Sequence, residues 1–263
     1  MKPCRLLTVF FLVLNSFGHS FAQRNISGKK GLINIPDASD SFKGDFTIGY
    51  VYNPMKYGLI KQGVWSEQVL YADLAITSRL NCTFLLLQGR TGGKRRIVEG
   101  LGDRQFDLRY QLLKEKKNQP SLAIIMSNPF SISSGFGTQA LVAGKTLRIS
   151  RKISSSFQMG YGSPYYIMRN ESNLSNNDIL DKFKLIKKSE DRYKSDYLTG
   201  VFGGIKFDVA KKGGILLEWD THKLNAGAYV NFFKSVTLQA ATLKWNAIIC
   251  GVSYTHNLNS AKP

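Results

Sequence analysis

The stretch of sequence that decides the fold is residues 105–112, which read Gln105-Phe106-Asp107-Leu108-Arg109-Tyr110-Gln111-Leu112. Apolar residues occupy every even position, and polar or charged residues occupy every odd one. Successive side chains of a β-strand point to opposite faces, so one face of this stretch is apolar and the other is polar. The stretch therefore predicts a strand that separates an apolar environment from a polar one.

The same alternation recurs along the chain and predicts about twelve strands. Clusters of Gly, Asn and Lys separate many of these segments, which indicates tight turns between antiparallel neighbours and hence a meander. The predicted strands are residues 45–52, 67–77, 82–87, 105–112, 121–127, 139–149, 156–162, 199–208, 215–220, 224–232, 236–243 and 248–255.

A long meander with one apolar and one polar face forms either a soluble sandwich or a closed barrel, and alternation alone is identical in both. Two features favour a membrane barrel. The longer segments approach the ~9–11 residues that a tilted strand needs to cross a bilayer. Opposed charges also share the polar faces, Asp107 with Arg109 and Lys206 with Asp208, as suits a narrow lumen. We therefore expect an all-β fold, a closed antiparallel barrel of outer-membrane type.

Composition limits the possible classes of protein. The chain has 263 residues, a length that one barrel domain can use in full. After residue 23 it lacks the long apolar runs of a helical membrane protein, and its 31 aromatic residues (16 Phe, 12 Tyr, 3 Trp) exclude a disordered chain. The 36 Lys and Arg against 18 Asp and Glu require an anionic partner: nucleic acid, lipid or polysaccharide.

The first 23 residues have the order of a secretory signal peptide: basic residues, an apolar run and a small-residue cleavage region. Cleavage near Arg24 would remove Lys2 and Arg5, leaving 34 basic against 18 acidic residues, or +16. Export disfavours nucleic acid as the partner. We expect the excess charge to be spread over turns, one basic loop and one strand face instead of forming a single patch.

The predicted organisation of the exported chain has three parts. Residues 24–42 form an N-terminal periplasmic segment, residues 43–258 form the barrel, and residues 259–263 form a C-terminal tail. A long loop at residues 169–197 interrupts the barrel, and residues 179–186 within it could form a short amphipathic helix. Cys82 and Cys250 are expected to be isolated small hydrophobes, although they could pair.

No catalytic or metal-binding motif is present, so we expect neither an enzyme nor a cofactor. Glu218 and Asp220 share a strand face, where an ion pair with Arg109 or Lys206 is the expected role. Charged residues of the polar faces and of the basic loop are the candidates for contact with a glycan. These are Arg104, Asp107, Arg109, Lys206, Asp208, Glu218, Asp220, Lys94, Arg95 and Arg96.

Several short motifs resemble those of the YjbH-like exopolysaccharide-biosynthesis proteins of the outer membrane. The segment from Gly31 and Leu32 to Pro36 and Ala38 is similar to the opening motif of that family. Further similarities follow in the same order at residues 102–113, at Gly137-Thr138, at Gly203-Gly204 and at residues 216–220.

The resemblance implies a role in producing or secreting an extracellular polysaccharide, alongside other secretion proteins. Lumen and loop Lys and Arg would then attract an acidic glycan, with outer-membrane lipid around the barrel. Three other functions stay open: a diffusion pore that favours anions, a structural outer-membrane barrel, and a soluble secreted sandwich.

Overall fold

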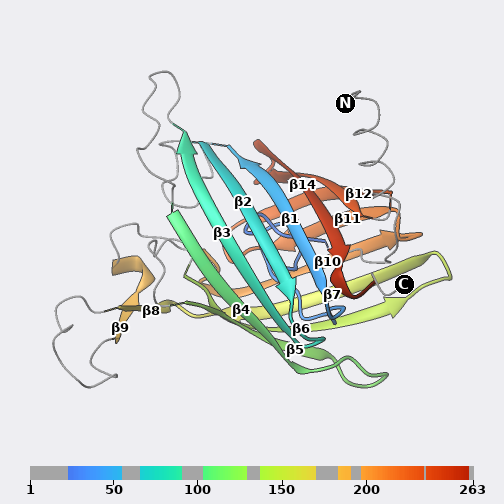
Figure 1. Cartoon of the computed structure of the whole chain (residues 1–263), viewed down its shortest axis with the longest axis horizontal. Coiled ribbons are helices and arrows are strands. Elements are labelled where there is room, and N and C mark those ends of the chain that lie inside the picture. The colour runs from blue at the N-terminus through green and yellow to red at the C-terminus, as the bar shows by residue number, and fades with distance from the viewer. Residues whose placement is uncertain are drawn as a thin grey trace, which may run out of the picture.

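The computed structural model describes residues 23–54, 66–90, 103–128, 137–169, 183–190, 197–233 and 235–260 (Figure 1). The predicted signal peptide up to residue 22 and the basic loop with Lys94, Arg95 and Arg96 lie outside these ranges. Within them, no helix has the length and apolar character needed to cross a membrane.

Twelve strands of the described chain form one closed antiparallel barrel, as predicted. Strands consecutive in sequence pair along the wall, except that β7 pairs with β10, and β14 pairs with β1 to close the wall. The strands are β1 (Asp45–Asn53), β2 (Ser66–Ala75), β3 (Leu80–Arg90), β4 (Asp103–Leu113), β5 (Ser121–Ser127), β6 (Gln139–Arg148), β7 (Ile153–Gly162), β10 (Gly200–Val209), β11 (Gly213–Trp219), β12 (Leu224–Phe232), β13 (Val236–Leu243) and β14 (Ala247–Asn257).

Between β7 and β10 the chain leaves the wall and forms a separate two-stranded sheet, β8 (Tyr165–Arg169) and β9 (Phe183–Lys187). The helix expected at residues 179–186 is therefore wrong for residues 183–186, and residues 179–182 lie outside the described ranges. The reason is local. An isolated two-turn helix is marginal in water, whereas pairing with β8 satisfies the backbone of Phe183–Lys187.

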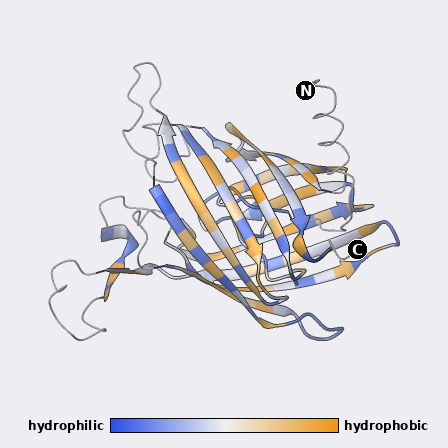
Figure 2. Ribbon diagram, viewed as in Figure 1, coloured by the Kyte–Doolittle hydropathy of each residue, from blue (hydrophilic) through white to orange (hydrophobic). Residues whose placement is uncertain are grey.

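The two faces of the wall divide as the alternation predicts. On β4, Asp107 and Arg109 are buried on the inside, whereas Leu108 and Tyr110 are about two-fifths exposed on the outside. Figure 2 shows the alternation of hydrophilic and hydrophobic residues along the strands. Because the polar face is the inner one, the barrel is inside-out relative to a soluble sandwich, which buries its apolar faces.

The barrel has two different ends. Short turns at residues 76–79, 114–120, 149–152, 210–212 and 233–235 lie at the end where β1 begins and β14 finishes, which we call the turn end. At the opposite end, which we call the loop end, longer connections of residues 54–65, 91–102, 128–138 and 163–199 join the strands, together with two short turns at residues 220–223 and 244–246. In the turn between β10 and β11, Ala210 and Lys211 both have positive φ, 51° and 58°, the hairpin geometry that matches strand twist.

The core of the molecule is inside the barrel, where residues 23–41, which we call the plug, pack against the inner side of the wall. The plug side chains Leu32, Ile33 and Ile35 are fully buried and share one hydrophobic cluster with Phe202 and Leu216 of the wall. In Figure 1 the plug is the blue chain seen behind β1 and β2. We expected residues 24–42 to form a separate periplasmic segment, whereas the structure packs nearly all of them into the lumen. The physical reason is that a twelve-stranded wall encloses more space than its own side chains fill.

Candidate functional site

The plug is held in a compact shape by the side chain of Asn25. Its Oδ1 accepts hydrogen bonds from the backbone N–H of Ser27 at 3.1 Å and of Lys29 at 3.0 Å. Its Nδ2 donates to the carbonyl of Asn34 at 3.0 Å, which ties the two arms of the plug together. Gly28 turns the chain with φ +77°, in the left-handed region that glycine adopts without strain.

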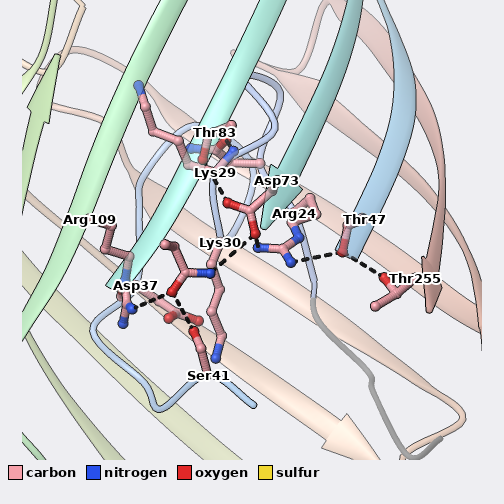
Figure 3. A network of polar contacts seen from close by, with 12 residues as sticks. Arg24, Lys29, Lys30, Asp37, Ser41, Thr47, Asp73, Thr83, Arg109 and Thr255 are labelled. Carbon is pink, nitrogen blue, oxygen red and sulfur yellow. Dashed lines mark hydrogen bonds and ion pairs between the residues drawn. The ribbon is translucent and has the colours of Figure 1, made fainter. Parts of the chain in front are cut away.

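An ion pair anchors the first residues of the plug to the inner face of β2 (Figure 3). The Arg24 guanidinium lies 2.9 Å from the Asp73 carboxylate, and both side chains are almost fully buried. Arg24 also donates to Thr47 of β1 at 2.9 Å, and Asp73 accepts from Thr83 of β3 at 2.7 Å. Buried charges need such partners because water does not reach them.

A second buried ion pair joins Lys29 of the plug to Asp107 of β4 at 2.9 Å. The Lys29 ammonium also lies 5.7 Å from the centre of the Tyr197 ring. Burial alone would lower the pKa of Lys29, but the Asp107 carboxylate and Tyr197 together outweigh it and raise that pKa above its ordinary value of 10.5. Lys29 therefore stays charged inside the lumen.

On the opposite wall, Glu218 of β11 holds the plug through its backbone. Its carboxylate accepts the N–H groups of Ile33 at 2.9 Å, Asn34 at 2.8 Å and Ile35 at 3.3 Å. Asn225 of β12 donates to the same carboxylate at 3.2 Å. A carboxylate that accepts several N–H groups forms charge-assisted hydrogen bonds, which are stronger than neutral ones.

Arg109 of β4 binds the returning arm of the plug. Its guanidinium donates to the carbonyl of Asp37 at 3.0 Å and to that of Ser39 at 2.5 Å. The neighbouring Gln111 donates to the carbonyl of Ala38 at 3.0 Å. Both wall residues thus bind the plug through its backbone carbonyls.

Two ionisable plug residues, Asp37 and Lys30, respond to this environment in different ways. Burial alone would raise the pKa of Asp37, but Lys30, Arg109 and Lys206 outweigh it and hold the pKa below its usual 3.8. Burial lowers the pKa of Lys30 to about 8, and the neighbouring cations add to this effect. The Lys30 ammonium donates to the carbonyls of Ser39 and Asp40.

A residue from the loop end reaches the plug from the other side. The Tyr197 hydroxyl donates to the carbonyl of Asn34 at 2.9 Å, and Lys188 donates to the Tyr197 carbonyl at 2.9 Å. Both residues are buried. The end of the long 169–197 connection therefore turns into the lumen and contacts the innermost part of the plug.

The structure places some of the predicted site residues otherwise than expected. Lys206 and Asp208 do pair in the lumen, at 3.4 Å. Asp107, however, pairs with Lys29 instead of Arg109, because the plug brings a cation closer. Arg104 is exposed on the outer face of β4, one residue out of phase with the lumen, so its assignment to the lumen or a loop is wrong.

The expected ion pair between Glu218 or Asp220 and Arg109 or Lys206 is also wrong. Glu218 binds the plug backbone, and Asp220 accepts hydrogen bonds from Asn34 at 3.1 Å and Asn225 at 2.8 Å. The plug fills the space between the two walls and supplies partners to both acids and bases. Binding of a glycan by any of these residues stays a prediction.

Two motifs of the resemblance that are far apart in sequence meet in space. An ideal Cβ at Gly204 would lie 2.7 Å from the Leu32 side chain, so glycine lets the plug approach β10 closely. Gly31 and Pro36 are buried within the plug, and Thr138 donates its N–H to Ser127 at 2.8 Å. Gly203 and Gly137 belong to the wall and to the residues just before β6.

Sequence reasoning missed Arg24, Lys29, Asp73 and Tyr197 as parts of this site. One signal was available for Asp73, which lies in the inward phase of its strand with no basic residue opposite it on β1 or β3. Such an acid requires a cation from outside the wall, and Arg24 lies in the nearby N-terminal segment. Tyr197 carried no comparable signal.

Within the described ranges, no group of three His, Cys, Asp or Glu is positioned to hold a metal ion. Cys82 and Cys250 are both free thiols, with Cys250 exposed on β14.

Together, the closed wall, the apolar exterior and the occupied lumen define a plugged transmembrane β-barrel of outer-membrane type. The chain belongs to the YjbH family, described as "Exopolysaccharide biosynthesis protein YbjH", whose model matches residues 24–263.

Solved structures similar to this chain include membrane channels. One is the "KdgM porin", with TM-score 0.45 and 8% identity, covering 80% of this chain and 99% of the porin. Another is an outer membrane channel from Pseudomonas putida F1, with TM-score 0.35 and 11% identity, covering 84% of this chain and 98% of the channel. No curated protein matches the sequence.

Proposed function

We propose that this protein is an outer-membrane barrel that takes part, without enzymatic activity, in the production or secretion of an exopolysaccharide. The observation that carries the proposal is the placement of the family's opening motif, Gly31 to Ala38. In this chain that motif is part of the plug, which is held by buried ion pairs of Arg24 and Lys29 and by Glu218. The family description supplies the biological process.

The two ends of the barrel suggest its orientation. Outer-membrane barrels have short turns on the periplasmic side and longer loops outside the cell. The turn end, where both ends of the barrel wall meet at Asp45 and Asn257, would then face the periplasm. An exported chain whose signal peptide is removed in the periplasm would present the plug to the lumen from that side.

The occupied lumen favours a gated role over a permanently open pore. Twelve strands enclose a lumen of intermediate width, between barrels that side chains fill and porins with an aqueous channel. The plug occupies this lumen, so a polymer could pass only if the plug were displaced. Displacement would expose Asp73, Asp107, Arg109 and Glu218, whose donors and acceptors suit the hydroxyl and acid groups of a glycan.

The proposal is tested by deleting the gene and measuring both surface polysaccharide and uptake of small solutes. We expect less surface polysaccharide and unchanged uptake. Unchanged polysaccharide would overturn the proposal. Complementation with the wild-type gene controls for effects on neighbouring genes.

The alternative function is a general diffusion pore that favours anions, and conductance measurements test it directly. Planar-bilayer recordings of the full-length protein should show little conductance while the plug is docked. A steady, anion-selective conductance of the wild-type protein would favour the pore. Polysaccharide loss without conductance would favour the secretion role.

A further inference from the structure

The five turns at the turn end are strongly basic. Their 21 residues contain nine Lys and Arg and a single acid, Glu115, a net charge of +8. Each of the five turns contributes at least one basic residue. They are widely separated in sequence, from residue 76 to residue 235, so nothing in the local sequence makes them one surface. The barrel topology brings them together around one rim.

Among the described residues, most basic side chains of this rim are exposed and lack acidic partners. Within the described ranges, none of the exposed ones forms an ion pair, whereas the sole acid of these turns, Glu115, pairs with Lys145 of β6 at 3.4 Å. We call this exposed set the basic collar, and we include in it Arg148, at the end of β6, and Lys43, two residues before β1. Its members are Lys43, Arg79, Lys116, Lys117, Arg148, Arg151, Lys152, Lys211 and Lys212.

Exposed apolar side chains adjoin the collar on the outside of the wall. Leu147 and Ile149 flank Arg148, Ile153 follows Lys152, and Val209 precedes Lys211 by two residues; all four apolar residues are exposed. In Figure 2 the tips of the turns at residues 114–120 and 149–152 are hydrophilic, next to hydrophobic strand residues. In a membrane barrel this boundary lies at the level of the lipid head groups.

We infer that the basic collar binds the head groups of anionic phospholipids in the leaflet at the turn end. The charges lie along the turn-end rim from β1, through the turns after β2, β4 and β6, to the turn before β11, beside the lipid-facing band. The lumen-facing Lys206 of β10 is already paired with Asp208. An anionic phospholipid matches both the exposed charges and the adjoining apolar side chains. Its acyl chains would lie against Ile149 and Val209, and its phosphate against Lys152 and Lys211. The interaction fixes the depth of the barrel in the bilayer and goes beyond the proposed role in polysaccharide production.

The test uses the full-length protein reconstituted in phosphatidylcholine bilayers containing phosphatidylglycerol as the anionic probe. Spin-labelled lipids report the enrichment of each lipid next to the protein. We expect several-fold enrichment of phosphatidylglycerol over phosphatidylcholine, lost at ~1 M salt, where the Debye length is about 3 Å. The collar variant combines Lys116→Gln, Lys152→Gln, Lys211→Gln and Lys212→Gln, and should lose most of the enrichment.

A matched variant removes the same number of charges at the loop end and β9 side of the molecule. It combines Lys184→Gln, Lys187→Gln, Lys223→Gln and Lys244→Gln, and should keep the wild-type enrichment. Circular dichroism confirms that both variants contain the folded barrel. Equal enrichment in the two variants, or none in the wild type, would overturn the inference.

An acidic glycan is the other partner that such a collar could attract. Polygalacturonate added to the protein in pure phosphatidylcholine bilayers is the probe. If it binds in a collar-dependent way while lipid enrichment is the same in all variants, the collar is a glycan surface and the lipid inference fails. The deletion phenotype tests the proposed function separately, since it does not depend on which lipid surrounds the barrel.

Discussion

The carboxylate of Glu218 in β11 accepts the backbone N–H of Asn34 at 2.8 Å, joining residues that are 184 positions apart in the chain. The adjoining N–H groups of Ile33 and Ile35 point to the same carboxylate. The wall thus recognises the shape of the plug backbone at this point more than the identity of its side chains. Four predictions about the docking of the plug follow from its contacts.

Replacing Glu218 with Gln should loosen the tip of the plug. Glutamine offers one acceptor oxygen in place of two, and its NH₂ group would face backbone donors. Leaving buried donors unpaired costs about 1–3 kcal/mol, so amide exchange at residues 33–35 should accelerate about tenfold or more. Hydrogen-exchange mass spectrometry of the full-length protein measures this. Glu190→Gln, at an exposed ion pair with Lys187, is the control and should leave these amides unchanged; equal exchange in both variants would contradict the prediction.

Arg24 and Asp73 should show strong coupling in a double-mutant cycle. Arg24→Ala leaves the buried Asp73 carboxylate without its cation, and Asp73→Ala leaves the buried Arg24 guanidinium without its anion. Each change should reduce the free energy of plug docking by about 3–5 kcal/mol. The double variant should cost clearly less than the sum. Exchange protection of plug amides supplies the free energies. The exposed pair Lys187 and Glu190, 3.6 Å apart, serves as the reference and should couple by less than about 1 kcal/mol. Additive effects at Arg24 and Asp73 would show that their ion pair does not hold the plug.

Gly28→Ala should displace the plug while the barrel still folds. Gly28 has φ +77°, and an added Cβ would lie 2.3 Å from the Tyr71 ring. Gly200→Ala is a matched control, since Gly200 has φ +108° with nothing within 4 Å of its added Cβ. The control should cost only backbone strain, about 1–2 kcal/mol, with the plug retained. Planar-bilayer conductance should rise for Gly28→Ala alone; the same conductance in both variants would rule out a steric cause at Tyr71.

Acid should release the plug only at low pH, and Asp37 should contribute to this. Its pKa lies below 3.8 in the docked plug, because the nearby cations outweigh burial. A depressed carboxyl pKa stabilises the docked state fully above about pH 4, and this contribution is lost as pH falls through the depressed value. Conductance should therefore stay low from about pH 5 to 8 and rise below about 4. Asp37→Asn should raise conductance at neutral pH and weaken the acid response, whereas Asp40→Asn should behave like the wild type. An acid response of unchanged size in Asp37→Asn would exclude Asp37 as a contributor.

The strands of the wall could be predicted from sequence because each depends on a local property. In residues 105–112 the two-residue period appears without reference to any other part of the chain. Antiparallel neighbours joined by short turns then require little further information. The helix expected near residue 183 fails for the opposite reason, since its strand exists through pairing with β8.

The contacts of the plug could not be predicted in the same way. Residues 23–41 lack periodicity, and their partners lie on strands up to about 200 residues away, as Gln239 does for Gln23. The order of charged residues also indicated the wrong ion pair. Asp107 shares a strand face with Arg109, but its partner in the structure is Lys29 of the plug. The sequence placed part of the positive charge on turns, but only the barrel topology puts five of these turns at the same end, where their charges form one collar.

The sequence by itself determined that this chain forms twelve alternating strands, with one apolar and one polar face. Those are consequences of residue order within each strand, where side chains alternate regardless of the rest of the fold. Only the tertiary structure decided that the polar face lies inward, that residues 23–41 fill the lumen, and that Leu32 meets Gly204. These depend on the closure of β14 onto β1, which creates an interior whose width and charge no single segment specifies.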